Sequence, residues 1–431
     1  MSETKDWKTA VTDGMLLLDR AIVFAAVKHS GAMRKETSIP YVTHVIETME
    51  IVSRMTEDEE IRAAAVLHDT LEDTKTTKEE LERNFGKRVA DLVEAESENK
   101  RAGQPEADTW LTRKKETIQH LSEAQTEIRM IALGDKLSNT RAMHRDFTEI
   151  GKKLWKRFNK KDPGLHAYYY LSLMDVFGSD ETIRKTPEYR EYAALCGDLF
   201  GKADPGSSLN NEGWRLHQEG REDEAAEWYQ EAARFGNTTA MVNLGNNYEN
   251  REDYEKAYEW YLEAALAGDV TGMFNVANMH YWGWHVRQDY QKAWEYFKRL
   301  YELDVDGTCL YMGLYAENGF IDEKDYKKAA AYYREGVDKE EEYCAVNLGR
   351  MYCLGLGMEK NEQKGFEFYL LGYRQGDILA CANLGYCYEV GQGVQKDMAK
   401  ALSYYEEGAA KGEEHCAEAL ERLKAGENQP D

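Results

Sequence analysis

The C-terminal half of the chain repeats itself with a nearly fixed period. The pattern Asp-Tyr-x-Lys-Ala-x-x, followed by two aromatic residues, recurs at 253–261, 289–297 and 325–333, with weaker copies on either side. A small residue anchors each copy and returns after 32 residues once and after 36 residues four times. These anchors are Ala225, Ala257, Ala293, Ala329, Gly365 and Ala401. A period of this length is typical of a solenoid, whose repeats bury their apolar faces against one another.

A second pattern lies between the first ones. Leu244-Gly245-x-x-Tyr248 returns at 348–352 and 384–388, and an alanine precedes the leucine by three or four residues each time, at Ala240, Ala345 and Ala380. Each unit therefore has two helical patterns, separated by Gly-Asp or Gly-Asn. The combination resembles the Sel1-like repeat, a relative of the tetratricopeptide repeat, and six units can be placed. We expect the small anchors to let paired helices approach, the aromatic residues to form core, and residues 413–424 to form a capping helix.

The N-terminal half carries a dense cluster of ionisable residues instead of a period. His68-Asp69 and Glu72-Asp73 follow an apolar run, so residues 65–74 predict a buried helix that ends at a polar site. Residues four apart on a helix share a face, which aligns His68 with Glu72 and Asp69 with Asp73. Burying this much charge is costly without a compensating cation. Imidazole and carboxylate are common metal ligands, so the segment predicts a divalent metal site.

Two further motifs flank this segment. Arg34-Lys35 precedes Pro40-Tyr41-x-x-His44, and Asp135-Lys136-Leu137-x-Asn139-x-Arg141 lies downstream. The order of histidines and aspartates is the H…HD…D pattern of the HD metal-dependent phosphohydrolases. The flanking residues resemble the hydrolase domain of the RelA/SpoT family, most closely its hydrolase-only members, the small alarmone hydrolases that remove pyrophosphate from (p)ppGpp. The resemblance covers roughly residues 15–180, and three ordered motifs make it specific.

The resemblance implies a metal centre and an acidic pair beside it. Its ligands would be His44, His68, Asp69 and Asp135. Two imidazoles with two carboxylates suit Mn2+, which the family also implies, and we expect no other compensation for these four groups. Glu72 and Asp73 would position or activate the attacking water, so they are the predicted catalytic residues. The spacing alone shows only that they can face the metal, and support of the ligands is the alternative.

The resemblance also implies the substrate contacts. These would be Arg34, Lys35, Tyr41, Lys136 and Asn139. Stacking of the Arg34 guanidinium on a purine is physically reasonable, with a solvated basic loop as the alternative. Asn139 shares a helical face with Asp135 and would contact the ribose. Arg141 lies about 240° around the helix from Asp135, so it is not among the predicted contacts. The basic run at 152–161 predicts a cationic helix stripe, which either attracts a phosphorylated substrate or is a solvated face.

Length and composition fit two domains. A chain of 431 residues exceeds one ordinary core. Only six prolines and abundant helix formers predict an all-α protein. We expect an HD-type hydrolase domain at 1–203, a breaker-rich linker near 201–208 and a repeat solenoid at 209–431, each folding alone. The N-terminal residues lack the form of a signal peptide, no apolar run is long enough for a membrane span, and the seven cysteines show no C-x-x-C pair. These features predict reduced thiols and a cytoplasmic protein.

Charge is unevenly shared between the two halves. Residues 1–203 hold 32 Lys and Arg against 36 Asp and Glu, a net charge of -4, whereas residues 204–431 hold 23 against 43, a net charge of -20. An acidic surface repels phosphate backbones, so we expect the repeats to bind no DNA or RNA. A protein or peptide partner fits such a surface. Acidity that only keeps the solenoid soluble is an equally good explanation.

The sequence thus favours Mn2+-dependent hydrolysis of the 3′-pyrophosphate of (p)ppGpp-like nucleotides, with the repeats mediating protein interaction. Within the enzyme class, (p)ppApp or the 2′-phosphate of NADPH would present a similar phosphate beside a purine ribose. Outside it, the HD domain could be a non-catalytic nucleotide sensor. The acidic pair Glu72-Asp73 favours the enzyme, because a binding module has no need of it.

Overall fold

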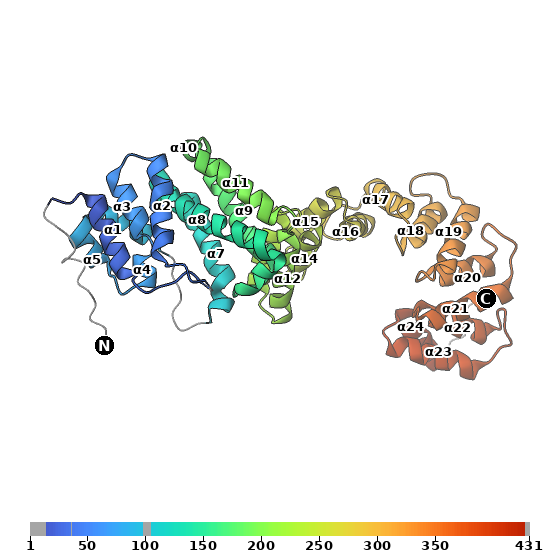
Figure 1. Ribbon diagram of the computed structural model, residues 1–431. Helices are drawn as coiled ribbons and strands as arrows, with labels where there is room; N and C mark the ends of the chain where they lie inside the picture. The colour runs from blue at the N-terminus through green and yellow to red at the C-terminus, as the bar shows by residue number, and fades with distance from the viewer. Residues whose placement is uncertain (1–13, 36, 98–104, 427–431) are drawn as a thin grey trace. The chain divides into compact units, whose positions relative to one another are not determined.

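The computed structural model describes residues 14–35, 37–97 and 105–426, and its regular elements are helices (Figure 1). The predicted all-α class is therefore confirmed. Chain contacts divide the molecule into two compact units, Met1–Phe235 and Gly236–Asp431. Each unit is described by itself below.

The first unit contains the helices that carry the predicted motifs. They are α1 (Leu17–Lys28), α2 (Val42–Met55), α3 (Glu59–Leu67), α4 (Thr70–Asp73), α5 (Lys78–Phe85), α6 (Lys87–Glu96), α7 (Glu106–Glu123), α8 (Thr126–Ile150), the 3-10 helix η2 (Gly151–Arg157), α9 (Pro163–Ser179), α10 (Glu181–Arg184), α11 (Pro187–Phe200), α12 (Pro205–Gln218) and α13 (Glu222–Arg234). Two apolar clusters hold them together. One joins α1, α2, α3, α5 and α6, and the other joins α2, α7, α8, α9 and α11.

Helices α2, α3 and α8 meet where the two clusters adjoin, and small residues allow the close packing. Ala63, Ala64 and Ala65 make the middle of α3 narrow and are fully buried. On α8, Gly134 faces α2, where an added Cβ would lie 2.7 Å from Val52 Cγ2. Gly134 thus brings the next residue, Asp135, close to α2.

The single helix predicted over 65–74 is wrong, because the structure divides it into α3 and α4 at His68-Asp69. At this point side-chain groups, and not main-chain N–H groups, bond two carbonyls of α3. His68 Nδ1 lies 2.8 Å from the Ala65 carbonyl, and Thr70 Oγ1 donates to the Leu67 carbonyl at 2.6 Å. Such local bonds compete with the regular helical ladder and end it. The turn nevertheless keeps one helical bond between the two predicted acidic positions, because Asp73 N donates to the Asp69 carbonyl at 2.9 Å.

The basic run at 152–161 does not form the predicted α-helical stripe. Gly151, with a positive φ of 57°, ends α8, and the run continues as the 3-10 helix η2 and a bend. Trp155 is buried within it against Phe147 and Phe158. Burial of this indole fixes the path of the segment, so the lysines do not align at helical spacing.

The predicted linker is only a short turn, and the first repeat packs on the helices that precede it. Helix α12 begins at Pro205 and lies against α9, where a Cβ on Gly164 would come 2.0 Å from Ser208 Oγ. Tyr168 of α9 contacts Trp228 and Phe235 edge-on, with ring centroids 6.2 and 6.0 Å away. The first compact unit, which ends at Phe235, therefore includes α12 and α13 as well as the helices of the predicted domain 1–203.

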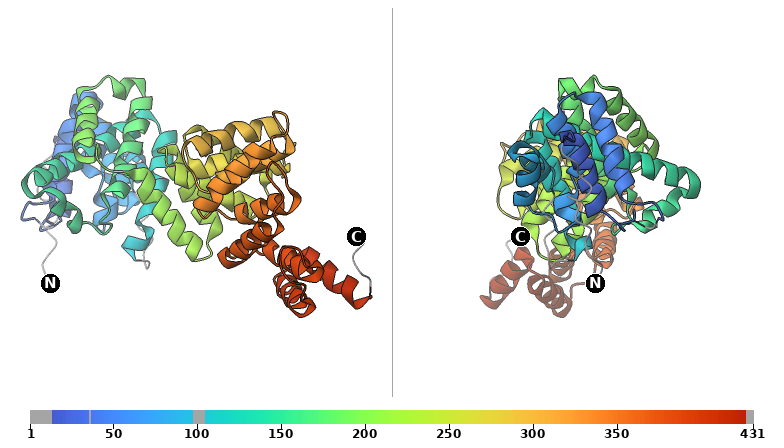
Figure 2. Two further views of the ribbon diagram at one scale, coloured as in Figure 1. Left: turned by 90° about the vertical axis from the view of Figure 1, so that its right-hand side faces the viewer. Right: turned by 60° about the vertical axis from the view of Figure 1, so that its left-hand side comes forward.

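The second unit is a stack of helix pairs, which Figures 1 and 2 show from α14 to α24 in yellow to red. Its helices are α14 (Thr238–Glu249), α15 (Tyr254–Leu266), α16 (Val270–Trp282), α17 (Tyr290–Glu302), α18 (Thr308–Asn318), α19 (Tyr326–Asp338), α20 (Cys344–Leu354), α21 (Glu362–Gln375), α22 (Leu379–Val390), α23 (Met398–Ala410) and α24 (Glu414–Lys424). The last of these confirms the predicted capping helix.

The residues of the repeated patterns have structural roles. The aspartate of the first pattern caps a helix: Asp253, Asp289 and Asp325 each accept a hydrogen bond from the backbone N–H three residues later. The glycine of the second pattern faces an aromatic ring within the same pair. An added Cβ on Gly245 would lie 2.4 Å from Tyr261, and one on Gly385 would lie 2.5 Å from Tyr405. The second aromatic residue of each pattern is accordingly buried core.

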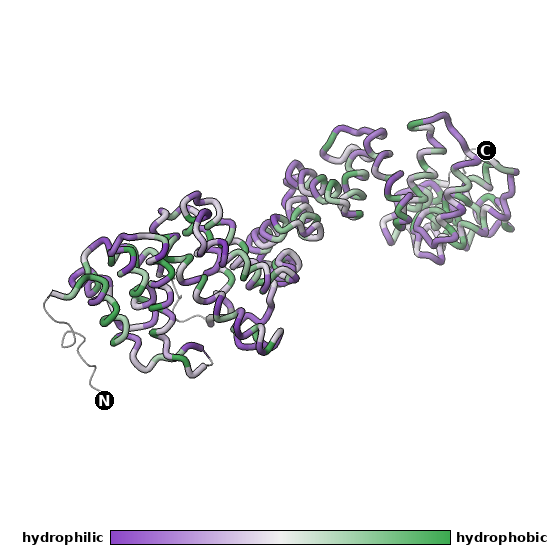
Figure 3. Tube along the Cα trace, turned by 45° about the horizontal axis from the view of Figure 1, so that its top comes forward, coloured by the Kyte–Doolittle hydropathy of each residue, from purple (hydrophilic) through white to green (hydrophobic). Residues whose placement is uncertain are grey.

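The described helices carry mixed hydropathy along their length (Figure 3). None of them combines the length and the apolar character needed to cross a membrane. All seven cysteines are free and buried, in agreement with the expectation of packed thiols.

Candidate metal centre

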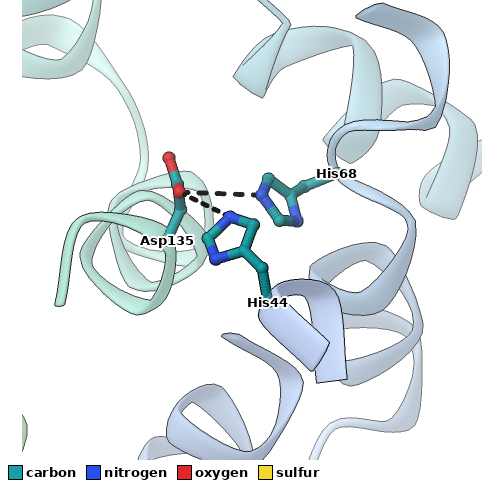
Figure 4. A group of neighbouring side chains, drawn as sticks. All are labelled: His44, His68 and Asp135. Atoms are coloured by element: carbon teal, nitrogen blue, oxygen red, sulfur yellow. Dashed lines mark ion pairs between the residues drawn. The ribbon is translucent and has the colours of Figure 1, made fainter. Parts of the chain in front are cut away.

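Three of the four predicted ligands converge between α2, α3 and α8. His44, His68 and Asp135 are buried, and each offers one ligand atom within 4.8 Å of the other two. Asp135 Oδ1 lies 3.1 Å from His44 Nε2 and 3.8 Å from His68 Nε2. Figure 4 shows both imidazoles pointing at this carboxylate. Residues far apart in sequence thus form one cluster of nitrogen and oxygen donors.

The fourth predicted ligand lies beside this cluster. Asp69 Oδ2 is 2.9 Å from His68 Nε2 and 3.5 Å from His44 Nε2. The hydroxyl of Tyr41 donates to the same oxygen at 2.6 Å. The structure therefore places Tyr41, a predicted substrate contact, on a predicted ligand.

Hydrogen bonds on the outer edge of each ring orient the histidines. His68 Nδ1 lies 2.8 Å from the Ala65 carbonyl, which can only accept, so this nitrogen carries a proton. His68 Nε2 is buried and lies 2.9 Å from Asp69 Oδ2 and 3.8 Å from Asp135 Oδ1. This nitrogen and the two carboxylates together are donors of the kind that a divalent cation takes.

Lys136 supplies charge compensation that the sequence analysis did not expect. Its ammonium pairs with Asp135 Oδ2 and lies 3.9 Å from Glu96 Oε1. Burial lowers the pKa of Lys136, but the Asp135 carboxylate outweighs burial and holds that pKa well above its usual value. A cation beside the ligands is therefore always present, and the acidic groups do not depend on a metal alone.

The cluster strongly perturbs its own ionisation. Burial alone would raise the pKa of Asp135, but Lys136, His44 and His68 hold it well below its usual value. Burial would likewise lower the pKa of His68, and the charges of Asp69 and Asp135 raise it well above the usual value. Such opposed shifts in one cluster are typical of functional sites.

Glu96 is a site residue that the motifs did not reveal. It ends α6, its side chain is only 5% exposed, and its Oε2 has no hydrogen-bond partner within the described residues. Burial raises the pKa of its carboxyl to about 8. A signal was available: Val89, Leu92, Val93 and Glu96 share one apolar helical stripe, on which an acid is out of place.

Two predicted substrate contacts are joined to the ligands. Arg34 Nη2 donates to Asn139 Oδ1 at 3.2 Å, and Asn139 Nδ2 donates to Asp135 Oδ1 at 2.6 Å. Lys35 lies at the surface, where its ammonium donates to Asn159 Oδ1 at 3.3 Å. Arg34 and Asn139 thus lie on the metal side of α8, whereas Lys35 points to a different neighbour.

The predicted catalytic pair lies on α4 at the edge of the cluster. Glu72 is half-buried and Asp73 is exposed. The charge of Glu72 acts on Glu96, while that of Asp73 acts on His29 and Tyr41. Both carboxylates thus act electrostatically on groups in or beside the cluster. His29 is also buried, and its ring centroid lies 5.1 Å from that of Tyr41.

Comparison with known proteins agrees with the two parts of the fold. Residues 21–162 match the family model of the HD domain. Six segments match the Sel1 repeat: 217–237, 238–269, 270–305, 308–339, 343–377 and 378–413. The guanosine-3′,5′-bis(diphosphate) 3′-pyrophosphohydrolase MESH1 of Danio rerio is 36% identical over 132 residues, which are 30% of this chain and 70% of that protein.

Two solved structures are also similar. A Sel1 repeat protein from Oxalobacter formigenes shares 24% identity, with a TM-score of 0.46 over 52% of this chain and 88% of that chain. A metazoan ortholog of SpoT that hydrolyses ppGpp shares 25% identity, with a TM-score of 0.33 over 44% of this chain and 98% of that chain.

Proposed function

Because this chain belongs, through its N-terminal domain, to the HD-domain family of the MESH1 guanosine-3′,5′-bis(diphosphate) 3′-pyrophosphohydrolases, we propose that it is a metal-dependent nucleotide pyrophosphohydrolase. The proposed reaction releases pyrophosphate from the 3′ position of a (p)ppGpp-like nucleotide. One observation carries the proposal: His44, His68 and Asp135 form a buried donor cluster in a domain of this family.

The proposed cofactor is Mn2+, held by His44, His68, Asp69 and Asp135. Two nitrogen and two carboxylate donors suit this ion, which also accepts additional oxygen ligands. When bound, such an ion lowers the pKa of a water molecule and polarises a phosphoryl oxygen. The convergence of the ring nitrogens of His44 and His68 on the Asp135 carboxylate supports this assignment.

The remaining site residues have distinct proposed roles. Glu72 and Asp73 orient the attacking water and take up its proton, because carboxylates at the cluster edge can serve as general bases. Arg34 stacks on the purine and Asn139 holds the ribose. Both are placed beside the proposed metal ligands, because Arg34 donates to Asn139 and Asn139 donates to Asp135. Tyr41 and Lys136 act mainly through the ligands Asp69 and Asp135, to which each is bonded.

Purified full-length protein with Mn2+, assayed against ppGpp, ppApp, NADPH and cyclic nucleotides, tests the proposal. We expect ppGpp to give GDP and pyrophosphate, identified by anion-exchange chromatography, and chelation to abolish the reaction. Preferential cleavage of ppApp or NADPH would keep the enzyme class and change the substrate. Tight nucleotide binding without turnover of any substrate would instead favour a nucleotide-sensing module.

The Sel1 repeats are proposed to bind a protein or peptide, and the chain to act in the cytoplasm. The excess of acidic residues in 204–431 favours a basic partner surface. Such binding should weaken as salt rises, because screening reduces attraction between exposed charges. Salt-independent capture of a partner by residues 236–431 would argue against electrostatic selection.

A further inference from the structure

A chain of hydrogen bonds leaves the outer edge of His44 and crosses three helices. His44 Nδ1 lies 2.9 Å from Ser138 Oγ, and Ser138 Oγ donates to Glu47 Oε2 at 2.7 Å. Arg141 Nη1 donates to Glu47 Oε1 at 3.1 Å. The same guanidinium holds both carboxylate oxygens of Glu191, at 2.7 and 2.6 Å. The chain therefore links α2, α8 and α11, and none of these contacts involves a predicted substrate residue.

The direction of these bonds determines which ring nitrogen of His44 carries the proton. A serine hydroxyl has one proton, and a carboxylate can only accept. Ser138 directs its proton to Glu47, so its oxygen faces His44 as an acceptor and Nδ1 must donate. When the ring is neutral it has one N–H, and Nε2 then keeps its lone pair toward Asp135 and the cluster.

We propose that Glu47 is a positioning residue of the metal centre, which acts through Ser138 to hold His44 in the tautomer that presents Nε2 to the metal. The inference rests on the metal-dependent function proposed above. It adds a residue to the site that belongs to none of the three motifs. Ser138 and His44 are both buried, so the hydrogen bond between them is shielded from solvent.

Arg141 determines how the amide of a Glu47→Gln variant is oriented. In Glu47→Gln, the amide oxygen is expected to stay on the Arg141 guanidinium, which can only donate. The amide NH2 then faces Ser138 and donates to it. The Ser138 hydroxyl turns to His44 Nδ1, the ring proton moves to Nε2, and that nitrogen is blocked for the metal.

Mn2+ titration of the full-length protein by isothermal calorimetry tests the proposal. Glu47→Gln should weaken Mn2+ binding by about ten- to a hundredfold, the range found for partners of metal ligands. Glu50→Gln is the matched control, because Glu50 lies exposed on the same helix, and it should bind as the wild type does. Equal Mn2+ affinity of Glu47→Gln and the wild type would overturn the proposal.

A second substitution separates tautomer control from structural damage. In Glu47→Gln/Ser138→Ala, no hydroxyl can donate to His44 Nδ1, so Mn2+ affinity should recover above that of Glu47→Gln. Independent structural losses would instead add, and a double variant that binds more weakly than Glu47→Gln refutes tautomer control.

The tautomer can also be observed in the wild type, which covers the case of a Glu47 variant that does not fold. Long-range 15N spectra of histidine-labelled, metal-free protein, at a pH where the ring is neutral, should show His44 protonated on Nδ1. Protonation on Nε2 would overturn the inference. A wild type that binds no Mn2+ would refute the proposed function and the inference together, whereas equal binding by Glu47→Gln would refute the inference alone.

Discussion

At the scale of single residues, the two histidines of the centre are oriented by different means. His68 is oriented locally, through a carbonyl three residues before it in the chain. His44 is oriented by Ser138, which lies 94 residues away on α8. The bond of His68 forms wherever its turn forms, while the bond of His44 to Ser138 depends on the packing of α8 against α2. A change in the local turn or a change in the helix packing can therefore each disturb the centre.

Loss of a ligand should remove the metal directly. We expect His68→Ala or Asp69→Ala to lose bound Mn2+ and activity, because the remaining donors are too few to hold the ion. Mn2+ content measured by atomic emission after gel filtration checks this. His120→Ala, at an exposed histidine, is the control and should retain full metal content. If His68→Ala keeps both metal and turnover, the assignment of the centre is wrong.

Substitution of the acidic pair should separate chemistry from binding. Glu72→Gln/Asp73→Asn should lower kcat by about a hundredfold or more, the usual contribution of general-base catalysis, with Mn2+ affinity unchanged. Arg34→Ala should instead raise the Kd for the nucleotide. Single-turnover rates and equilibrium nucleotide binding distinguish the two effects. Normal turnover by the double variant would shift support to the sensing alternative.

At the scale of elements, the distance between α2 and α8 governs the centre. Val52 Cγ2 and the Thr48 carbonyl of α2 lie 2.7 and 3.1 Å from where a Cβ of Gly134 would be. Asp135 follows this glycine directly. Any side chain at 134 must therefore push apart the two helices that carry His44 and Asp135.

Gly134→Ala should destabilise the protein by about 1–3 kcal/mol, as overpacking of a core usually does, and should weaken Mn2+ binding. Gly197→Ala is a matched control on α11, because nothing lies within 4 Å of the added Cβ. That variant should be neutral or slightly stabilising. Chemical denaturation and Mn2+ titration test both variants, and an unperturbed Gly134→Ala would contradict the role of this close approach.

Buried ion pairs between the helices of the array make its stability depend on pH. Glu389 is buried, and its Oε2 accepts hydrogen bonds from Tyr405 Oη at 2.9 Å and Arg422 Nη2 at 2.7 Å. Burial raises the pKa of Glu389, but Arg422 and Tyr405 outweigh burial and leave it below the ordinary 4.5. A depressed folded-state pKa contributes stability above the unfolded value and loses it as pH falls.

Glu389→Gln should therefore destabilise residues 236–431 at neutral pH by about 1–3 kcal/mol, the usual worth of hydrogen bonds to a charged group. The difference from the wild type should shrink as pH falls from about 4.5, where the carboxyl of the unfolded chain becomes protonated, through the lower pKa of the folded protein. Urea denaturation between pH 3 and 7 measures it, with exposed Glu406→Gln as control. A difference that does not change with pH would mean that the charge of Glu389 contributes nothing.

At the scale of the whole molecule, the first repeat belongs to the same compact unit as the hydrolase helices. Helix α12 lies against α9, Trp228 of α13 contacts Tyr168 of α9 edge-on, and Lys115 of α7 pairs with Glu227 of α13 at 2.8 Å. A cut near Gly206 would break α12 and uncover these contacts. The boundary between independently stable pieces is thus better placed after Phe235.

We expect residues 1–235 and 236–431 to fold as separate soluble pieces, with metal binding and turnover confined to the first. A piece ending at 205 should melt several degrees lower, because it exposes Tyr168 and the α9 surface. Thermal melts and ppGpp hydrolysis by the purified pieces test this. Equal melting of both N-terminal pieces would mean that α12 and α13 add no stability to the hydrolase helices.

The sequence alone determined the all-α class, the repeat array and the motif residues of the centre. Small and aromatic residues that recur with this period are buried when helix pairs stack. The three ordered motifs are specific enough to predict that His44, His68 and Asp135 lie in one site. Glu96 was also within reach of sequence reasoning, as an acid on an apolar stripe.

Tertiary structure decided what depends on contacts between distant segments. The Glu47–Ser138 support of His44 and the packing of the first repeat on α9 each join groups whose own sequence neighbourhoods give no sign of the partner. Helix propensity and spacing describe one segment at a time. The energies that fix these features come from burial and hydrogen bonding between segments, which arise only once the chain has folded.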